Sequence, residues 1–240
     1  MTYGAPGALG ALPDRLVHVR QEIADRQAAG GWTHPVTVVA VTKGFGVDAV
    51  AAALAVGLTE IGENRVQEAL EKQEALDNMA TDLGRAAHWH LIGHLQRNKA
   101  KHVPGRFALV HSIDSPRLAE ELSARAAAAA QRVRVLLQVN VAEEPQKAGC
   151  APADAPALAR RVAALEGLAL EGMMTLAPFT DDRDVPRRTF AGLRRLRDTL
   201  QEEGLWLPTL SMGMSADFGT AVEQGATLIR LGTVLFGART

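Results

Sequence analysis

The stretch Val38-Val39-Ala40-Val41-Thr42-Lys43 decides the fold class, because it is a short apolar run rich in β-branched residues that ends on a charged side chain. A run without polar alternation is typical of a strand buried on both faces of a sheet. Leu228-Ile229-Arg230-Leu231-Gly232-Thr233, near the other end of the chain, has the same character and leads into a turn of small residues. Both stretches therefore predict buried strands with polar groups at their carboxyl ends.

Between these two stretches, apolar runs alternate with helical patterns. Ser115-Pro116 and Asp154-Ala155-Pro156 each combine a capping residue with an early proline, which marks the start of a helix. The strand candidates are residues 36–42, 58–62, 88–92, 107–113, 133–141, 168–175, 209–212 and 227–231. This alternation predicts an α/β fold, a single (β/α)8 barrel of the TIM type, with a doubly wound open sheet as the alternative.

The predicted barrel takes up residues 14–240 as one domain, since alternating folds of this size form around a single core. Residues 1–13 are rich in Gly, Ala and Pro and are expected to form a flexible tail. The first helix is predicted at residues 16–29, where Leu16, Val19 and Ile23 share one face.

The bulk composition excludes several classes of partner. The chain has 26 Lys and Arg against 27 Asp and Glu, which gives no general attraction to nucleic acid or to an anionic membrane. No apolar stretch reaches the roughly 20 residues that a membrane-spanning helix needs. With the single cysteine Cys150 and no secretory signal pattern, the expected location is the cytoplasm.

Chemistry in a (β/α)8 barrel lies at the carboxyl ends of the strands, which directs attention to Lys43. Its amine would enter the barrel mouth and could form a Schiff base with a carbonyl ligand held beside it. Taken alone, Lys43 is better explained as a solvated lysine that begins a loop.

The loops after the seventh and eighth strands have the composition of a phosphate site. Gly213 and Gly232 permit close approach of the backbone, Ser215 and Thr233 supply hydroxyl groups, and residues 216–223 are predicted to form a helix that faces the anion. Tight turns explain either loop alone. Two such loops in the positions where barrels bind phosphate favour the binding site.

Three further residues are candidates for contact with a cofactor ring. Arg230 lies in an apolar strand and either forms a structural salt bridge or meets a pyridine nitrogen, which it would leave neutral. Asn64 either contacts the ring or caps a helix. Met212 can line a flat ring, although a place in the core also suits it.

The histidines offer a competing hypothesis. His88 and His90 share one face of a strand and His94 follows, which could begin a metal site like those of amidohydrolase barrels. Those barrels also need histidines and an aspartate on late strands, which strands five, six and eight do not provide. Packed or loop-bonding histidines are therefore the preferred interpretation, and no metal is predicted.

Six segments of the chain resemble the pyridoxal phosphate homeostasis proteins. They are AVTK (40–43), IGENRVQE (61–68), WHLIGHLQRNK (89–99), SID (112–114), LSMGMSADF (210–218) and RLGTVLFGAR (230–239). The departures are Gly44-Phe45 after the lysine and Ala148 at a position where serine or glycine is common, and they bear on the preference for a substrate or partner.

The resemblance implies a barrel like the N-terminal domain of alanine racemase, with pyridoxal 5'-phosphate (PLP) held as a Schiff base on Lys43. It also implies that Asn64 lies by the cofactor, that Arg230 meets the ring nitrogen and that Ser215, Gly232 and Thr233 hold the phosphate. The implied function is to carry or regulate PLP in vitamin B6 and amino-acid homeostasis.

The same resemblance implies that the protein is not an enzyme, with a low-activity racemase-like enzyme as the alternative. Alanine racemases supply their second proton-transfer group as a tyrosine from a separate domain, whereas the only tyrosine here is Tyr3, in the expected tail. The expected partners are PLP and apo forms of PLP-dependent enzymes. Because the racemase dimer contact uses the additional domain, a monomer is expected.

Overall fold

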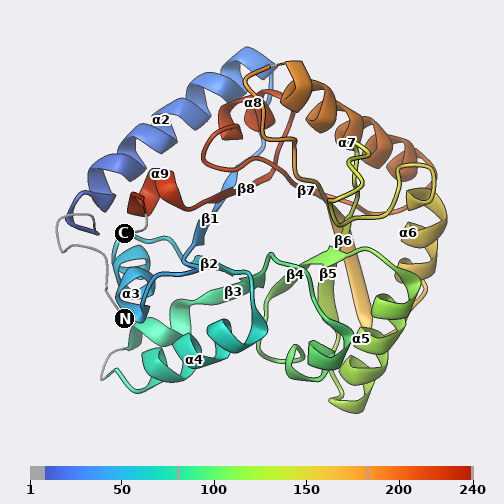
Figure 1. The fold of residues 1–240 in the computed structure, drawn as a ribbon, viewed down its shortest axis with the longest axis horizontal. Coiled ribbons are helices and arrows are strands. Elements are labelled where there is room, and N and C mark those ends of the chain that lie inside the picture. Colours follow the sequence, from blue (N-terminus) through green and yellow to red (C-terminus); the bar gives the residue numbers. More distant parts are fainter. Residues whose placement is uncertain (1–8, 80–81, 183, 239–240) are drawn as a thin grey trace.

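The computed structural model describes residues 9–79, 82–182 and 184–238, and its strands form a closed parallel barrel. Helices surround the barrel on the outside (Figure 1). The strands are β1 Thr37–Val41, β2 Glu60–Glu63, β3 His88–Leu91, β4 Leu109–Ile113, β5 Val133–Gln138, β6 Leu168–Met174, β7 Thr209–Ser211 and β8 Leu228–Leu231. Each lies within one of the predicted strand segments or overlaps it, and the predicted (β/α)8 barrel is confirmed.

Helices connect most of the consecutive strands. The α-helices are α2 Leu12–Gly30, α3 Val47–Ala55, α4 Val66–Asp77, α5 Pro116–Ala128, α6 Ala155–Ala163, α7 Asp184–Glu202, α8 Phe218–Glu223 and α9 Thr233–Phe236. Two 3-10 helices, η1 Asp82–Ala86 and η2 Arg97–His102, precede β3 and β4. The long α2 packs along α8 and α9, so it covers the part of the barrel wall where β1 and β8 pair (Figure 1).

The first helix begins earlier than the sequence predicted. Leu12 and Pro13 open α2, and the Leu12 side chain is 1% exposed, so this part of the expected tail packs against the barrel. A proline in the first turn costs no hydrogen bond, which explains why it starts the helix. Residues 1–8 of that tail lie outside the described residues.

The closure of the barrel brings the two opening sequence stretches together. β1 pairs with β8 in parallel, with Ala40 opposite Leu231, and β1 also pairs with β2, with Val41 opposite Gly62. Residues that follow these pairs therefore emerge side by side at the carboxyl ends of the strands. Lys43, Asn64 and Gly232 all belong to this set.

The interior of the barrel has two different layers. Val39, Leu109, Leu136, Met174 and Leu228 form a small apolar cluster of their own, separate from the larger core between strands and helices. Other inward positions are polar, and His90, His111, Ser211 and Arg230 are all buried. Branched apolar side chains normally dominate this region of a (β/α)8 barrel, so the polar layer calls for a functional explanation.

Candidate functional site

A cavity of about 470 Å³ lies at the carboxyl ends of the strands, and we call it the mouth cavity. Its volume falls in the range of about 300–1,000 Å³ that is usual for small-molecule sites. Six of the seven residues that the sequence singled out line it, namely Lys43, Asn64, Ser215, Arg230, Gly232 and Thr233. The fold thus brings together residues from β1, β2, β7 and β8 whose separation in the chain is large.

Met212, which the sequence also singled out as a ring contact, is the exception, because the structure does not place it in the cavity wall. Its side chain is fully buried in the core between the barrel and the helices, and it is not among the described residues that line the mouth cavity. The cause is the alternation of side chains along an extended strand. Ser211 points into the barrel, where it contacts Arg230, and the next residue must therefore point outward. Met214 lines the cavity instead.

Lys43 lies in a tight turn directly after β1. The Phe45 N–H donates to the Thr42 carbonyl oxygen at 3.0 Å, and Gly44 has φ = 74°. A positive φ at the third position of such a turn favours glycine, so Gly44 lets the chain reverse immediately after the lysine. The turn leaves Lys43 in the cavity wall while the backbone returns toward α3.

Both neighbours of Lys43 are held by a buried ionic cluster, Glu63–Lys72–Glu68. The Lys72 Nζ donates to Glu63 Oε1 at 2.6 Å, to Glu68 Oε1 at 2.9 Å and to the Thr42 carbonyl oxygen at 2.8 Å. The Thr42 hydroxyl donates to Glu63 Oε1 at 2.6 Å, and the Gly44 N–H donates to Glu68 Oε1 at 2.6 Å. The cluster therefore fixes the backbone on each side of Lys43.

The electrostatics of this cluster follow from its depth. Burial raises the pKa of Glu63, whose side chain is fully buried, while Lys72 opposes the shift. Burial also acts against ionisation of Glu68, but hydrogen bonds from the Gly44 N–H and from Lys72 outweigh it and lower its pKa. Sequence reasoning missed the cluster, although the four-residue spacing of Glu68 and Lys72 was a usable signal.

Asn64 lines the mouth cavity after β2, and its backbone lies against Gly93, after β3. At Gly93 an added Cβ would lie 2.3 Å from the Asn64 carbonyl oxygen, so only glycine allows this approach. The residue at the N-cap of α4 is Arg65, and it makes no side-chain capping bond. The alternative role of Asn64 as a helix cap is therefore not what the structure shows.

The loops after β7 and β8 meet, as the sequence predicted. The helices around them differ from the prediction: a short helix, α9, follows β8, and the helix after β7 begins later. The Ser215 Oγ accepts hydrogen bonds from the N–H groups of Gly232 and Val234, both at 3.3 Å, and so joins the loop after β7 to the start of α9. The Ser215 hydroxyl hydrogen remains available for an anion. The helix predicted at residues 216–223 is shorter, because Asp217 instead accepts from the Met214 N–H at 2.6 Å and α8 begins at Phe218.

Arg230 crosses from β8 into the polar layer beneath the cavity. Its Nη1 donates to the Ser211 Oγ at 2.6 Å and its Nη2 donates to the Thr175 carbonyl oxygen at 3.0 Å. Burial lowers its pKa to about 10, with Asp217 opposing the shift, so the guanidinium stays charged at neutral pH. Neutral oxygens rather than a carboxylate hold it, in contrast to the salt bridge that the sequence left open.

Several cavity residues had not been predicted as ligand contacts. Phe45, Ile92 and Leu176 supply apolar wall, and His94 and Gln138 supply polar groups. The Gln138 Nε2 donates to the Ala148 carbonyl oxygen at 2.9 Å, which binds the 148 loop to β5. Gln138 and Leu176 lie at or just after the carboxyl ends of predicted strands, so their place in the cavity wall could have been predicted. The position of Phe45 depends on the turn at Gly44.

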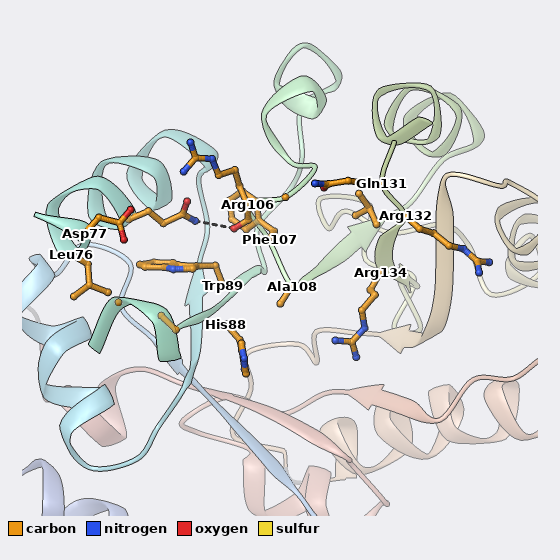
Figure 2. Close-up of a pocket in the computed structure, with 15 residues that line it drawn as sticks. Leu76, Asp77, His88, Trp89, Arg106, Phe107, Ala108, Gln131, Arg132 and Arg134 are labelled. Carbon is orange, nitrogen blue, oxygen red and sulfur yellow. Dashed lines mark hydrogen bonds between the residues drawn. The ribbon is translucent and has the colours of Figure 1, made fainter. Parts of the chain in front are cut away.

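A second cavity, of about 440 Å³, opens near the amino ends of β3 and β5 (Figure 2). Its wall includes Trp89, Arg106, Arg132 and Arg134, but the arginines are exposed and two are already engaged. Arg134 pairs with both oxygens of Glu171 at 2.7 Å, and the Arg132 Nε donates to the Leu168 carbonyl oxygen. This cavity lacks the convergent buried donors of the mouth cavity, which is therefore the better candidate site.

No described helix has the length and apolar character that crossing a membrane demands. No group of three or more His, Cys, Asp or Glu residues is arranged to hold a metal ion within the described residues. His88 and His90 instead hydrogen-bond to the two oxygens of Glu60.

Comparison with known proteins links this geometry to one family. The family model for the N-terminal domain of alanine racemase matches residues 18–240. The pyridoxal phosphate homeostasis protein of Pseudomonas aeruginosa is 44% identical over 232 residues, which cover 96% of this chain and 97% of the relative. PipY of Synechococcus elongatus, solved with PLP bound, has a TM-score of 0.81 and 35% identity and covers 94% of this chain and all of its own.

A Clostridium difficile alanine racemase matches with a TM-score of 0.75 at 15% identity, covering 94% of this chain and 60% of its own. At that identity the likeness concerns the fold alone. It agrees with the closed barrel described above.

Proposed function

Because this chain belongs to the family of pyridoxal phosphate homeostasis proteins, we propose that its mouth cavity binds PLP and that the protein carries or regulates this cofactor in vitamin B6 and amino-acid homeostasis. The observation that carries the proposal is the convergence of Lys43, Arg230 and the Ser215–Gly232 loop pair on one cavity. Each group matches a different part of the cofactor.

The donor set fits PLP in its chemistry. When bound, the cofactor supplies an aldehyde that condenses reversibly with a lysine amine, and Lys43 is the lysine in the cavity wall. The hydroxyl of Ser215 and the start of α9 at Gly232 and Thr233 would hold the phosphate. Asn64 would lie beside the ring.

Arg230 is the residue that would meet the ring nitrogen. A guanidinium has five N–H donors, and the two described bonds to Ser211 and Thr175 leave others for a ligand. A charged arginine donates a proton only in a hydrogen bond and keeps the ring nitrogen neutral, which weakens the ring as an electron sink. This arrangement favours binding of the cofactor over strong carbanion chemistry.

A carrier rather than an efficient enzyme is also supported by the cavity lining. Its described residues include no carboxylate, cysteine or tyrosine. His94 is the remaining candidate for proton exchange besides Lys43, and its side chain is 56% exposed and lies 3.5 Å from Asp114. The presence of His94 keeps a low-activity racemase-like enzyme as the second candidate.

We further propose that apo forms of PLP-dependent enzymes receive the cofactor, that this exchange takes place in the cytoplasm and that the protein acts as a monomer. The neutral charge balance gives no reason to expect nucleic acid as a partner. Gel filtration with light scattering tests the monomer, and transfer of bound PLP to a stated apoenzyme tests the partner.

An absorbance titration with PLP tests the proposed function. Wild-type protein should develop a visible band that saturates at one equivalent, Lys43→Ala should lose the band, and Lys101→Ala, an exposed lysine outside the cavity, should retain it. A racemase assay on the same samples separates the two candidates, since robust alanine racemisation that depends on Lys43 would favour the enzyme. Equal bands in wild type and Lys43→Ala would contradict the proposal.

A further inference from the structure

A continuous chain of hydrogen bonds crosses the interior of the barrel behind the mouth cavity. The Arg230 Nη1 donates to the Ser211 Oγ at 2.6 Å, and the Ser211 Oγ lies 2.9 Å from the His111 Nδ1. The His111 Nε2 lies 2.9 Å from the His90 Nδ1, and the His90 Nε2 lies 2.5 Å from the Glu60 Oε2. We call these five residues the axial chain. It links β8, β7, β4, β3 and β2.

The axial chain is buried over most of its length. Ser211 and His111 are 0% exposed, Arg230 is 3% exposed and His90 is 4% exposed. Polar groups at such depth destabilise the protein unless each has a partner, and an apolar side chain of similar size would fill the space without that requirement. Packing alone therefore does not account for the chain.

Donor counting fixes the Glu60 end of the chain. Hydrogen bonds from His90 and His88 outweigh the effect of burial and lower the pKa of Glu60 to about 2, so its carboxylate can only accept. His90 therefore donates through Nε2. Its Nδ1 lies 2.9 Å from the His111 Nε2, and one of these two nitrogens donates to the other.

Burial lowers the pKa of His111 well below its ordinary value, so His111 is neutral and has one ring hydrogen. It therefore donates in one of its two contacts, to His90 or to Ser211, and accepts in the other. At the cavity end Arg230 can only donate, so the Ser211 oxygen accepts from its Nη1. The chain thus runs between a fixed acceptor, Glu60, and a fixed donor, Arg230.

The geometry points to His111 and His90 as positioning residues for Arg230, although the described structure places neither in the lining of the mouth cavity. We propose that the axial chain holds the Arg230 guanidinium in the one orientation that presents its unused donors to the ring nitrogen of PLP. This inference rests on the proposed function. It adds His90 and His111, from the barrel interior, to the residues that line the mouth cavity.

The far end of the chain provides a matched control. His88 contacts the other oxygen of Glu60, with its Nδ1 2.7 Å from Oε1, but its side chain is 58% exposed and it lies outside the chain. Figure 2 shows His88 and Arg134 projecting from β3 and β5 toward the same side of the second cavity. His88 and His90 thus differ in whether they connect Glu60 to Arg230.

The test compares PLP affinity and the absorption spectrum of the bound cofactor among chain variants. Ser211→Ala should weaken PLP binding by about tenfold and shift the spectrum, because Arg230 loses one of its two anchors. Ser211→Thr, which keeps the hydroxyl, should restore most of both properties. His90→Asn should weaken binding by about threefold, and His88→Asn should match wild type.

Competition with inorganic phosphate is the internal control, because phosphate would bind the loops after β7 and β8 and not the site of the ring. The affinity for inorganic phosphate should be unchanged in every variant of the axial chain. Wild-type affinity and spectrum in both Ser211→Ala and His90→Asn would overturn the inference, even with lowered thermal stability. Failure of wild type itself to bind PLP would instead contradict the proposed function. If Ser211→Ala does not fold, His90→Asn and Glu60→Gln decide the result.

Discussion

Two groups of buried polar side chains support residues of the mouth cavity. The Glu63–Lys72–Glu68 cluster lies behind Lys43 and is ionic, with Lys72 within 2.9 Å of both carboxylates. The axial chain lies behind Arg230 and passes through two imidazoles and a hydroxyl. The first group holds backbone atoms on each side of a lysine, whereas the second holds a side chain.

The two ways of support suit the two side chains, Lys43 and Arg230. Lys43 has a long side chain, so fixing Thr42 and Gly44 sets where its stem begins. Arg230 presents a planar group whose orientation matters, and two directed bonds set that plane. We therefore expect loss of the ionic cluster to affect stability most, and loss of the axial chain to affect ligand contacts most.

Removing the cation from the ionic cluster should give the largest effect. In Lys72→Met the buried Glu63 loses its compensating charge, and breaking a buried pair in this way costs about 3–5 kcal/mol of unfolding free energy. Urea denaturation followed by circular dichroism measures the change. Lys101→Met, at an exposed lysine of η2, should stay within about 0.5 kcal/mol of wild type.

The double variant Glu63→Gln/Lys72→Met sharpens this result. Because it removes both charges, it should recover part of the lost stability. A double variant less stable than Lys72→Met alone would show that the ion pair is not the source of the effect. The claim that the ionic cluster contributes most to stability would then be wrong.

Breaking the axial chain should have a smaller effect on the ligand-free protein. Ser211→Ala leaves Arg230 and His111 each without one partner, which costs about 1–3 kcal/mol. Ser112 is an adjacent control on β4, since its buried Oγ has no hydrogen-bond partner within the described structure. Ser112→Ala should therefore be neutral, and equal losses in the two variants would show that the chain contributes no more than an isolated hydroxyl.

The smallest effect should appear only in acid. The pKa of Glu60 is lowered from 4.5 to about 2, so the ionised group stabilises the fold above pH 4.5 and this contribution is lost as the pH falls toward 2. Glu60→Gln should therefore flatten the dependence of stability on pH in that window. Thermal melts across pH 2–6 measure it, and parallel curves for the variant and wild type would contradict the assignment.

The sequence predicted the strands and most cavity residues because buried strands and their small-residue turns have strong local patterns. The sequence placed Met212 at the ring because the length of the strand did not fix which of Ser211 and Met212 faces inward. The contact between Ser211 and Arg230 on the neighbouring strand β8 shows that Ser211 faces inward. The helix predicted at residues 216–223 begins two residues late, at Phe218, because the residues before it form a turn in which the Asp217 side chain accepts from the Met214 N–H.

The two polar groups could not be predicted for a different reason. Lys72 reads as an ordinary exposed residue on an amphipathic helix, and its burial depends on how α4 packs over β2. The contact between His90 and His111 depends on the register of β3 and β4, where His90 lies opposite Leu109. Local sequence does not encode that register, so such pairs need the three-dimensional structure.

The most direct test of the central assignment is borohydride reduction of the protein after incubation with PLP, followed by mass mapping of the modified peptide. The assignment predicts one pyridoxyl adduct on Lys43, formed at one equivalent, with Lys72 unmodified in its buried ion pair. An adduct on Lys72, or one scattered over exposed lysines such as Lys101, would contradict the mouth cavity as the PLP site.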